Sequence, residues 1–520
     1  SHDEIEYSWL TKHLDGNLKH LGYVPGNLVT KHIVKGRCPL FSLYLKENEE
    51  AREYFAPLMG HYDKSALNKA AYIRDVCKYS SSIPIGEVDH STFELAVGNV
   101  IEVLKDGGIT ECDYITDELT IIQDLNMNAA VEALYQGKKK DYLKDFETSD
   151  FERIVFESCE RLYQGKMGVW NGSLKAEIRP VEKVIQNKTR SFTAAPIETL
   201  LGGKVCVDDF NNAFYKAHLK IPSTVGITKF YKGWDTLLRK LPEGWIYCDA
   251  DGSQFDSSLT PYLLNAVITI REEFMEEWDV GKQMLRNLYT EIVYTPIAAP
   301  DGSLIKKFKG NNGGQPSTVV DNTLMVMLAM QYSLLKCGIE FDRQNEFIIY
   351  FCNGDDLIIA VEPSKAYILD SFEVYFKQLG LSYDFGNRVT EIEGLSFMSH
   401  AGKKVEDVYV PKLDKERIVA ILEWDRSVEP VSRLEAIVAA MVESWGYDDL
   451  ISEIRKFYTW VLEQAPYKQL AEEGKAPYLA DTALRRLYLD VQATDEELEK
   501  YHTYYMSLNE PDIIQRVSFQ

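Results

Sequence analysis

The pattern of apolar and polar positions divides the chain into three parts. Up to about residue 190, short helical patterns alternate with basic segments such as VTKHIVKG and GKKKDYLK. From about 190 to 400, strand-like apolar runs, glycine-rich turns and apolar helices alternate. After about 405, acidic amphipathic helices follow one another. No repeat of fixed period is present, and 520 residues exceed one ordinary core, so we expect a mixed α+β fold of several subdomains.

Two amphipathic helices are predicted in the last part. The segment SRLEAIVAAMVESW opens with Ser432 and Glu435 at the spacing of a capping box. Its apolar residues repeat at one helix face: Leu434, Ile437, Val438, Met441 and Val442. The next segment has the same pattern: Leu450, Ile451, Ile454, Phe457, Tyr458 and Val461. These patterns predict a helical bundle that packs against the centre of the protein.

The segment FIIYFCNGDDLIIAV, residues 347–361, places two adjacent carboxylates between two apolar runs. Both runs are β-prone, and Asn353-Gly354 is a favoured hairpin-turn pair, so a buried hairpin with Asp355 and Asp356 at its tip is predicted. Adjacent carboxylates repel each other, which favours a bound cation. An ordinary polar turn would also explain this segment if it stood alone.

A second group of carboxylates follows another strand-like run, in WIYCDADGSQFDSSLTP. Asp249, Asp251 and Asp256 are costly at one strand end unless cations or hydrogen-bond donors meet them. If Asp251 and Asp355 lie on neighbouring strands, they can hold two divalent ions about 3.5–4 Å apart. That arrangement suits in-line phosphoryl transfer.

A glycine-rich loop and a helix start lie between the two acidic segments, in KGNNGGQPSTVVDNTLMVM. Thr318 and Asn322 are four residues apart, so their side chains share one face of the predicted helix. A junction of this kind can contact an anionic backbone or a sugar hydroxyl. A glycine-rich turn with a simple helix cap is the alternative.

A basic cluster precedes the acidic segments, in KAEIRPVEKVIQNKTRSF. It contains five cations within sixteen residues: Lys175, Arg179, Lys183, Lys188 and Arg190. A solvated charged surface is the usual explanation of such a run. The whole chain has a net charge of −23, with 57 basic and 80 acidic residues, which argues against a protein that coats nucleic acid uniformly. A local basic cluster in so acidic a chain indicates a triphosphate or template contact.

Cysteine spacing and hydropathy argue against a zinc-binding, a secreted and a membrane-spanning protein. The eight cysteines contain no C-x-x-C pair, which argues against a zinc site or a disulfide framework and favours a reducing compartment. The N-terminal segment is too polar for a secretory signal. The most apolar stretch, Thr323–Leu335, is shorter than the ~20 residues of a membrane-spanning helix. We therefore expect a buried helix there, and membrane association only through partners or surface contacts.

In their order along the chain, the basic cluster, the DGSQFD segment, the glycine-rich loop and the NGDD turn resemble the motif series of positive-strand viral RNA-dependent RNA polymerases. The basic cluster resembles motif F, DGSQFD motif A, GGQPSTVVDN motif B and NGDD motif C. Further stretches, from VTKHIVKGRCPLF to EQAPYKQLAEEGKAPYLA, are similar to the potyvirus replicases, the nuclear inclusion b proteins. The likeness runs from about Val29 to Tyr488, and Ser1 and Gln520 resemble ends made by the protease of that family's polyprotein.

The resemblance implies a fold and its division. The fold is an α+β right hand of fingers, palm and thumb, with an antiparallel palm sheet and a closed fingers–thumb ring. The implied parts are 1–191, N-terminal extension and fingers; 192–261, palm with motif A; 262–305, a fingers insertion; 306–402, palm with motifs B to E; and 403–520, a helical thumb.

The resemblance also implies roles for single residues. Asp251, Asp355 and Asp356 would bind Mg²⁺, for which Mn²⁺ could substitute, and carry the catalytic step. Asp256 and Asn322 would sense the ribose 2′-hydroxyl. Thr318 would support that network, and Gly314 is the glycine of the same substrate-binding motif. Arg179, Lys183 and Arg190 would contact the incoming triphosphate, and Lys175 the template or the entry channel. LSFMSH, Leu395–His400, resembles motif E, which supports the primer strand.

The family implies the reaction and its partners. The protein would copy an RNA template into RNA from nucleoside triphosphates, with a viral genome-linked protein that presents a tyrosine hydroxyl as primer. Viral and host replication factors would be further partners. Replication would occur at membrane-bound complexes in the host cytoplasm, with membrane association indirect, and the protein would also accumulate in the nucleus.

Two departures from the family pattern, and two alternative functions, follow from the sequence. Gly313 stands where the family has a serine, so a hydroxyl near the ribose and Asp256 is missing, and we expect weaker discrimination or rate rather than abolition. After motif C the nearest basic residue is Arg388, not lysine, which fits only an electrostatic role.

A catalytically impaired replicase scaffold is supported by Gly313 alone. A reverse transcriptase is disfavoured because Asp256 and Asn322 are small polar residues, where a DNA-making enzyme places a bulky gate.

Overall fold

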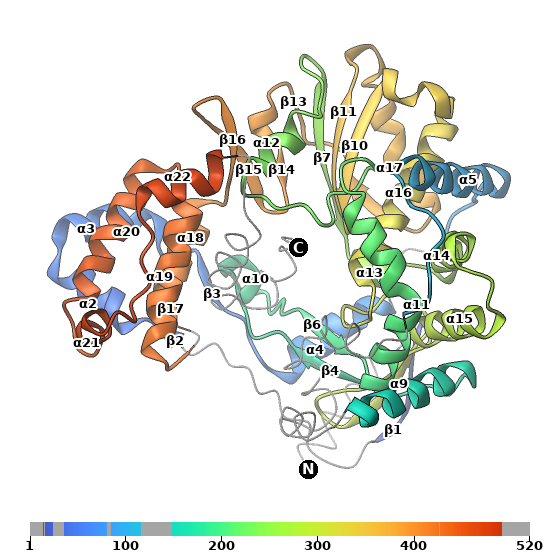
Figure 1. Ribbon diagram of the computed structural model, residues 1–520, viewed down its shortest axis with the longest axis horizontal. Coiled ribbons are helices and arrows are strands. Elements are labelled where there is room, and N and C mark those ends of the chain that lie inside the picture. The colour runs from blue at the N-terminus through green and yellow to red at the C-terminus, as the bar shows by residue number, and fades with distance from the viewer. Residues whose placement is uncertain are drawn as a thin grey trace.

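The computed structural model describes residues 14, 16–23, 36–80, 85–115, 148–425 and 427–490. The basic segment GKKKDYLK, Ser1 and Gln520 lie outside these ranges. Helices and strands are mixed throughout, as the sequence predicts (Figure 1). In this view the C-terminal helices form one side of the molecule, a central sheet the top, and a second sheet with its helices the remainder.

The central sheet is antiparallel throughout. Its strand order is β10-β11-β7-β12, and β13 also pairs with β7. The strands are β7 (Ile246–Ser253), β10 (Ile348–Asn353), β11 (Asp356–Val361), β12 (Ser382–Asp384) and β13 (Arg388–Val389). Alternate residues of β11 enter two different apolar clusters, so both faces of the hairpin are buried. This explains the nearly continuous apolar runs of the two strands.

The predicted hairpin is confirmed, but its turn is displaced by one residue. Asn353 pairs with Asp356 in the strand register, so Gly354 and Asp355 are the two central residues of the turn. Gly354 has φ +58°, a left-handed conformation that favours glycine. Asn353 was expected to belong to the turn pair. It is instead the last residue of β10, where its side-chain amide donates to the hydroxyl of Thr224 at 3.1 Å.

Helices cover both faces of the central sheet. One face packs against α16 (Thr318–Lys336) and α17 (Ile368–Gln378), and the other against α12 (Gly233–Leu238). The buried helix predicted over Thr323–Leu335 is confirmed, because nearly all of its side chains are inaccessible. Among the residues with described positions, no helix is both long enough and apolar enough to cross a membrane.

A second sheet has the strand order β1-β9-β8-β4-β6. Its strands are β1 (Leu18–Tyr23), β4 (Trp170–Leu174), β6 (Ser191–Ala194), β8 (Pro296–Ala298) and β9 (Ser303–Lys307). The helices of this part of the molecule are α4 (Lys69–Val76), α5 (His90–Asp106), α9 (Thr148–Tyr163), α11 (Ile197–Lys216), α13 (Phe255–Ser258), α14 (Pro261–Phe274) and α15 (Asp279–Val293). Strands near the N-terminus therefore pair with strands almost 300 residues further along the chain.

The C-terminal helices follow a small three-stranded sheet, β14 (Ser396–Phe397), β15 (His400–Val405) and β16 (Val408–Lys412). They are α18 (Lys415–Glu423), α19 (Pro430–Ser444), α20 (Asp448–Val461), α21 (Tyr467–Glu472) and α22 (Asp481–Leu489). Every apolar residue predicted to line the inner faces of α19 and α20 is buried, so the helical bundle is confirmed. The predicted capping box is wrong, because α19 begins at Pro430 with Glu429 as its N-cap, and Ser432 lies inside the first turn. Proline is pre-organised for the first helical position.

An N-terminal segment packs against these C-terminal helices. It comprises β2 (Gly36–Arg37), α2 (Pro39–Glu47) and α3 (Glu49–Phe55), and β2 pairs with β17 (Trp424–Asp425). The ring of Phe457 lies 5.1 Å from that of Phe41 and 5.1 Å from that of Tyr44. The chain then continues through β3 (Tyr62–Lys64), which pairs with β5 (Ile178–Pro180) beside the short helix α10 (Val181–Ile185). One continuous segment thus contacts both the C-terminal helices and the basic cluster.

Candidate active site at the aspartate turn

The strand register brings three aspartates together. Leu357 of β11 pairs with Ala250 of β7. Continuing this antiparallel register by one residue places Asp356, the first residue of β11, opposite Asp251, whose charge raises the pKa of Asp356. Asp355 occupies the adjoining turn. The expectation that carboxylates of the two acidic segments lie on neighbouring strands is confirmed, with Asp356 rather than Asp355 as the direct strand neighbour of Asp251. On its other side Asp251 pairs with Asp384 of β12.

Burial and mutual repulsion disfavour ionisation of this group. Burial raises the pKa of Asp355, and the charges of Asp356 and Asp256 raise it further. Burial also raises the pKa of Asp356, followed by the charge of Asp251. The pKa of Asp251 is raised by burial and then by Asp249 and Asp384. Such a set becomes stable in its charged form when a cation is placed among the carboxylates.

The chemistry of the donor set fits Mg²⁺. Carboxylate oxygens are hard ligands, and Mg²⁺ is usually held by one or two carboxylates together with substrate phosphates and water rather than by a closed protein cage. Within the described ranges, no three or more His, Cys, Asp or Glu side chains are grouped so that they could hold a metal ion by themselves. If Mg²⁺ is bound here, the aspartates would supply part of its coordination shell, and substrate phosphates and water would supply the rest.

Three side chains outside the sequence motifs fix the turn. The hydroxyl of Thr323, on α16, accepts a hydrogen bond from the Gly354 backbone N–H at 2.8 Å. Tyr383, which is buried, donates its hydroxyl to the Asp355 carbonyl at 2.6 Å. Thr224 accepts from Asn353, as described above. Sequence reasoning missed all three, and only the position of Thr323 next to Asn322 could have drawn attention to it.

The two residues expected to sense the sugar are in direct contact. The side-chain amide of Asn322 donates to Asp256 Oδ1 at 2.9 Å. Asn311 contacts both, since its amide donates to Asn322 Oδ1 at 2.9 Å and its backbone N–H to the Asp256 carbonyl at 2.7 Å. Asn311 was not singled out in the sequence, although it lies within the glycine-rich loop.

Thr318 and Gly314 act on the loop itself. The Thr318 hydroxyl lies 2.9 Å from the carbonyl oxygen of Asn312 and 3.1 Å from that of Gly313, so it closes the loop onto the helix start. Gly314 forms a bridge with Ala194, and a Cβ there would lie 2.3 Å from the Thr193 carbonyl oxygen. Glycine is therefore required at position 314 because the loop and β6 approach so closely.

Gly313 has more room. A Cβ at this position would meet only the ring of Phe192, at 3.5 and 3.6 Å, which is ordinary van der Waals contact. The residue is exposed and its φ is not positive. A serine at this position would therefore fit without strain in the surrounding loop.

The basic cluster is assembled around Glu177. This buried carboxylate pairs with Arg190, whose Nε donates to it at 2.6 Å, and with Arg179 at 3.8 Å. Partial burial lowers the pKa of Lys183, and the neighbouring charges of Arg179, Arg190 and Lys188 lower it further. Four of the five predicted cations thus lie close enough to repel one another, and a bound polyanion would relieve that repulsion.

Lys175 and the segment resembling motif E lie at the edges of this arrangement. The Lys175 ammonium lies 5.7 Å from the centre of the Phe192 ring, beside the glycine-rich loop. In Leu395–His400, Met398 and Ser399 have positive φ values of 53° and 65° between β14 and β15, as in a two-residue hairpin turn. Arg388 is bound to Asp370 at 2.7 Å, so its guanidinium is held by α17.

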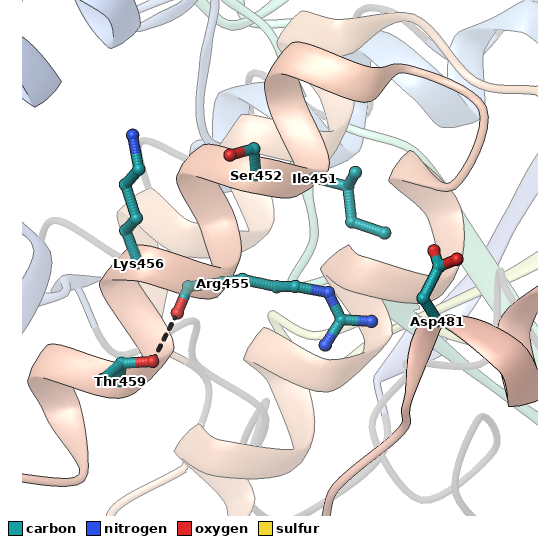
Figure 2. A pocket seen from close by; sticks show the side chains of 6 residues that line it. All are labelled: Ile451, Ser452, Arg455, Lys456, Thr459 and Asp481. Atoms are coloured by element: carbon teal, nitrogen blue, oxygen red, sulfur yellow. Dashed lines mark hydrogen bonds between the residues drawn. The ribbon is translucent and has the colours of Figure 1, made fainter.

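A surface pocket lies elsewhere, on the C-terminal helices (Figure 2). It has a volume of about 620 Å³ and is lined by Ile451, Ser452, Arg455, Lys456, Thr459 and Asp481. In Figure 2 the guanidinium of Arg455 extends across the pocket towards Asp481, and it donates to the Leu479 carbonyl at 3.0 Å. None of the predicted catalytic or substrate-binding residues lines this pocket.

All four motifs lie within one match to a known protein family. The family model described as viral RNA-dependent RNA polymerase matches residues 43–462. The chain belongs to this family. It is accordingly an RNA-directed RNA polymerase, and its mixed helices and strands agree with the right-hand fold that this family implies.

The polymerase is also similar to segments of viral genome polyproteins. It is 62% identical over 505 residues to that of Plum pox potyvirus (strain El amar), covering 97% of this chain and 33% of the polyprotein. The identity is 62% over 494 residues with that of Pea seed-borne mosaic virus (strain DPD1), covering 95% and 15%. With Turnip mosaic virus (strain Japanese) it is 61% over 493 residues, covering 95% and 16%. The chain thus spans a third or less of these relatives.

Proposed function

We propose that this polymerase replicates the genome of a positive-strand plant virus by two-metal nucleotidyl transfer. The observation that carries the proposal is the pairing of β11 with β7, whose register places Asp356 and Asp251 next to each other, with Asp355 in the adjoining turn. The three relatives are genome polyproteins of Plum pox potyvirus, Pea seed-borne mosaic virus and Turnip mosaic virus, and these plant-derived names support the replicase assignment.

The reaction joins a primer hydroxyl to an incoming nucleotide. The 3′-oxygen forms a bond to the α-phosphorus while the bond from that phosphorus to the bridging oxygen of the leaving group breaks. Pyrophosphate leaves with the electron pair, and the hydroxyl proton passes to solvent. Asp251, Asp355 and Asp356 would hold Mg²⁺, with Mn²⁺ as a substitute, and the bound ions would supply charge stabilisation to the attacking and leaving oxygens.

Discrimination between ribose and deoxyribose is assigned to Asp256 and Asn322. Their mutual hydrogen bond leaves polar atoms of both residues to meet a 2′-hydroxyl, and a site built to bond a hydroxyl rejects the analogue that lacks it. Neither side chain is bulky enough to exclude the hydroxyl, which disfavours the alternative of a reverse transcriptase. The loop around Gly313 keeps its hydrogen bonds without the serine, from Thr318 to the Asn312 carbonyl and from Asn311 to Asn322, which favours an active enzyme over an impaired scaffold.

The basic cluster is proposed to bind the triphosphate. Arg179, Lys183 and Arg190 gather around one buried carboxylate, which holds the two guanidinium groups while leaving the cluster with a net positive charge. Lys175 is proposed to contact the template.

A closed ring between fingers and thumb is part of the proposal. The packing of α2 and α3 on α20, and the continuation of the same segment to β3 and β5, support it. A closed ring would limit the relative movement of the two subdomains and enclose the template.

The partners and location are proposed from the same assignment. RNA template, nascent RNA and nucleoside triphosphates are the substrates. A genome-linked viral protein that is joined to a protease would supply a tyrosine hydroxyl as primer, and viral and host replication factors would assemble around the enzyme. The proposed sites are membrane-bound complexes in the host cytoplasm, reached through partners, and the host nucleus.

Primer extension by the purified protein tests the function. A primed heteropolymeric RNA template should direct synthesis of complementary RNA from ribonucleoside triphosphates with Mg²⁺, and a chelator should stop it. A DNA template and deoxyribonucleoside triphosphates should each reduce synthesis strongly. Equal use of deoxyribonucleotides would contradict the sugar assignment, and no template-dependent synthesis with Mg²⁺ or Mn²⁺ would contradict the function.

A further inference from the structure

We infer that a buried ion pair between α14 and α16, Arg271–Asp321, sets the sugar selectivity of the site through a chain of hydrogen bonds that ends at Asp256. This inference rests on the proposed sugar-sensing role of Asp256 and Asn322. Gln315 and Asn311 lie between the ion pair and the two sensors, Asn322 and Asp256. They act as positioning residues, without contact to the reacting atoms.

The ion pair lies where four helices meet. Arg271 of α14 is 1% exposed and Asp321 of α16 is fully buried, and Nη2 donates to Oδ1 at 2.7 Å. Tyr289 of α15 donates its hydroxyl to the other oxygen, Oδ2, at 2.7 Å. Asn211 of α11 accepts from Arg271 at 3.0 Å. A buried carboxylate with so many donors is held in one orientation, because any other would leave charges unpaired.

Gln315 transmits that orientation to the glycine-rich loop. Its side-chain nitrogen donates to Asp321 Oδ2 at 2.9 Å and to Asn311 Oδ1 at 3.2 Å, so both amide protons are used. Its oxygen accepts from the Ser317 backbone N–H at 2.6 Å. With Asp321 accepting only, the amide of Gln315 cannot be turned around without placing oxygen against oxygen.

The direction of donation continues to the sensors. Since Asn311 Oδ1 accepts from Gln315, its amide nitrogen must face outward, and it donates to Asn322 Oδ1 at 2.9 Å. The nitrogen of Asn322 therefore faces Asp256, to which it donates at 2.9 Å. Each side-chain amide in the chain fixes the orientation of the next one. The buried carboxylate of Asp321 thus determines which atoms of Asn322 and Asp256 face the sugar.

Lys307 anchors the other end of the same loop. Its ammonium is fully buried and donates to the carbonyls of Val293, at the end of α15, and Gly310, at the start of the loop, at 3.0 and 2.9 Å. The loop that carries Asn311 is thus fixed to α15 from both sides.

Gln315→Ala tests the inference, because it interrupts the chain and leaves the ion pair intact. The readout is the ratio of kcat/KM for a ribonucleotide to that for its 2′-deoxy analogue, measured by single-nucleotide extension on an RNA template. We expect this ratio to fall about tenfold, the effect of one lost hydrogen bond in the sensing network. Gln344→Ala is the matched control, since Gln344 is equally buried, 6% exposed, and its side-chain amide exchanges hydrogen bonds with Gln331, which is not part of this chain.

A general loss of folding would lower both kcat/KM values together and leave their ratio unchanged. Tyr289→Phe is the second variant, because it removes one donor to Asp321 without a change of volume, and it should lower the ratio about two- to threefold. An unchanged ratio in both variants, with a reduced ratio in Asn322→Ala, would overturn this inference and leave the proposed function standing. An unchanged ratio in Asn322→Ala as well would overturn the sensing role itself.

Discussion

The hydroxyl of Thr323 accepts a hydrogen bond from the backbone N–H of Gly354 at 2.8 Å. Thr323 directly follows Asn322 on α16, and Gly354 directly precedes Asp355 in the turn. The helix that carries the proposed sugar sensor is therefore bonded to the turn that carries a proposed metal ligand. A displacement of α16 would move both, so sugar recognition and the position of the carboxylates are structurally linked.

The two adjacent glycines of the loop should respond differently to serine. Gly313→Ser should change the free energy of unfolding by less than about 0.5 kcal/mol, because a Cβ fits there. It should raise ribonucleotide preference or rate by up to about tenfold through one added hydrogen bond. Steady-state kinetics with ribo- and deoxyribonucleotides measure the second effect.

Gly314→Ser is the matched control for that change. Its Cβ would lie 2.3 Å from the Thr193 carbonyl and 2.9 Å from the Ala194 Cα, both backbone atoms that cannot move aside cheaply. We expect a clear fall in melting temperature and activity. Equal tolerance of serine at both positions would contradict the described packing of the loop on β6.

The proposed triphosphate site predicts a specific kinetic change in Lys183→Ala. Lys183 is exposed and surrounded by other cations, so its loss should not destabilise the fold. The KM for nucleoside triphosphates should rise about tenfold, and salt should affect KM less than in the wild type. Lys240→Ala, at an exposed lysine beyond α12, is the control. A KM unchanged by Lys183→Ala would remove this residue from the site.

The pKa shifts predict how Mg²⁺ and pH together affect stability. Because the pKa values of Asp355 and Asp356 are raised in the folded protein, their ionisation opposes folding. In the metal-free protein, the free energy of unfolding that these two carboxyls contribute in their protonated form is therefore lost as the pH rises from the ordinary pKa of 3.8 through the raised pKa values. Mg²⁺ binds the ionised form, so its stabilising effect should grow over the same window, to about 2.7 kcal/mol at a hundredfold excess over Kd.

Thermal unfolding with Mg²⁺ or a chelator across this pH range checks the prediction. In Asp355→Asn the metal-free protein should lose less stability at higher pH, and the effect of Mg²⁺ should shrink. A Mg²⁺ effect that is the same at every pH, or the same in Asp355→Asn, would show that the ion stabilises the protein elsewhere.

The contact between the N-terminal segment and the C-terminal helices predicts a measurable coupling. Phe457→Ala should cost about 3–5 kcal/mol of stability, because its ring is fully buried against Phe41 and Tyr44. In a double-mutant cycle with Phe41→Ala, we expect a coupling energy of about 0.5–1.5 kcal/mol. Denaturant unfolding measures both. Strict additivity of the two changes would contradict the contact that supports a closed ring.

Local patterns in the sequence predicted those helices and strands whose formation depends on their own residues. The faces of α19 and α20 followed from 3.6-residue periodicity, and the aspartate hairpin from two apolar runs around a glycine. The errors were also local. The turn is displaced by one residue because Asn353 is held in β10 by Thr224, and the start of α19 is set by Pro430 rather than by Ser432.

The groups that support the site could not be predicted in this way. Tyr383 reaches the Asp355 carbonyl, and Asn311 joins Asp256 to Asn322, only because segments distant in sequence fold together. Nothing in the spacing of Arg271 and Asp321, which are 50 residues apart, indicates that they form a buried pair. The side chains proposed to bind substrate were recognisable by type and motif, while the side chains that hold them in place depend on tertiary structure.

The central claim, that the opposed aspartates carry the chemistry, is tested most directly by primer extension with Asp355→Ala on an RNA template in saturating Mg²⁺. Asp342→Ala, at an exposed aspartate in the segment before β10, is the matched control. We predict that Asp355→Ala lowers the rate of incorporation about a thousandfold or more, because several kcal/mol of transition-state stabilisation are lost. Without metal, both variants should melt at or above the temperature of the wild type. Incorporation by a folded Asp355→Ala protein at the rate of Asp342→Ala would contradict the account.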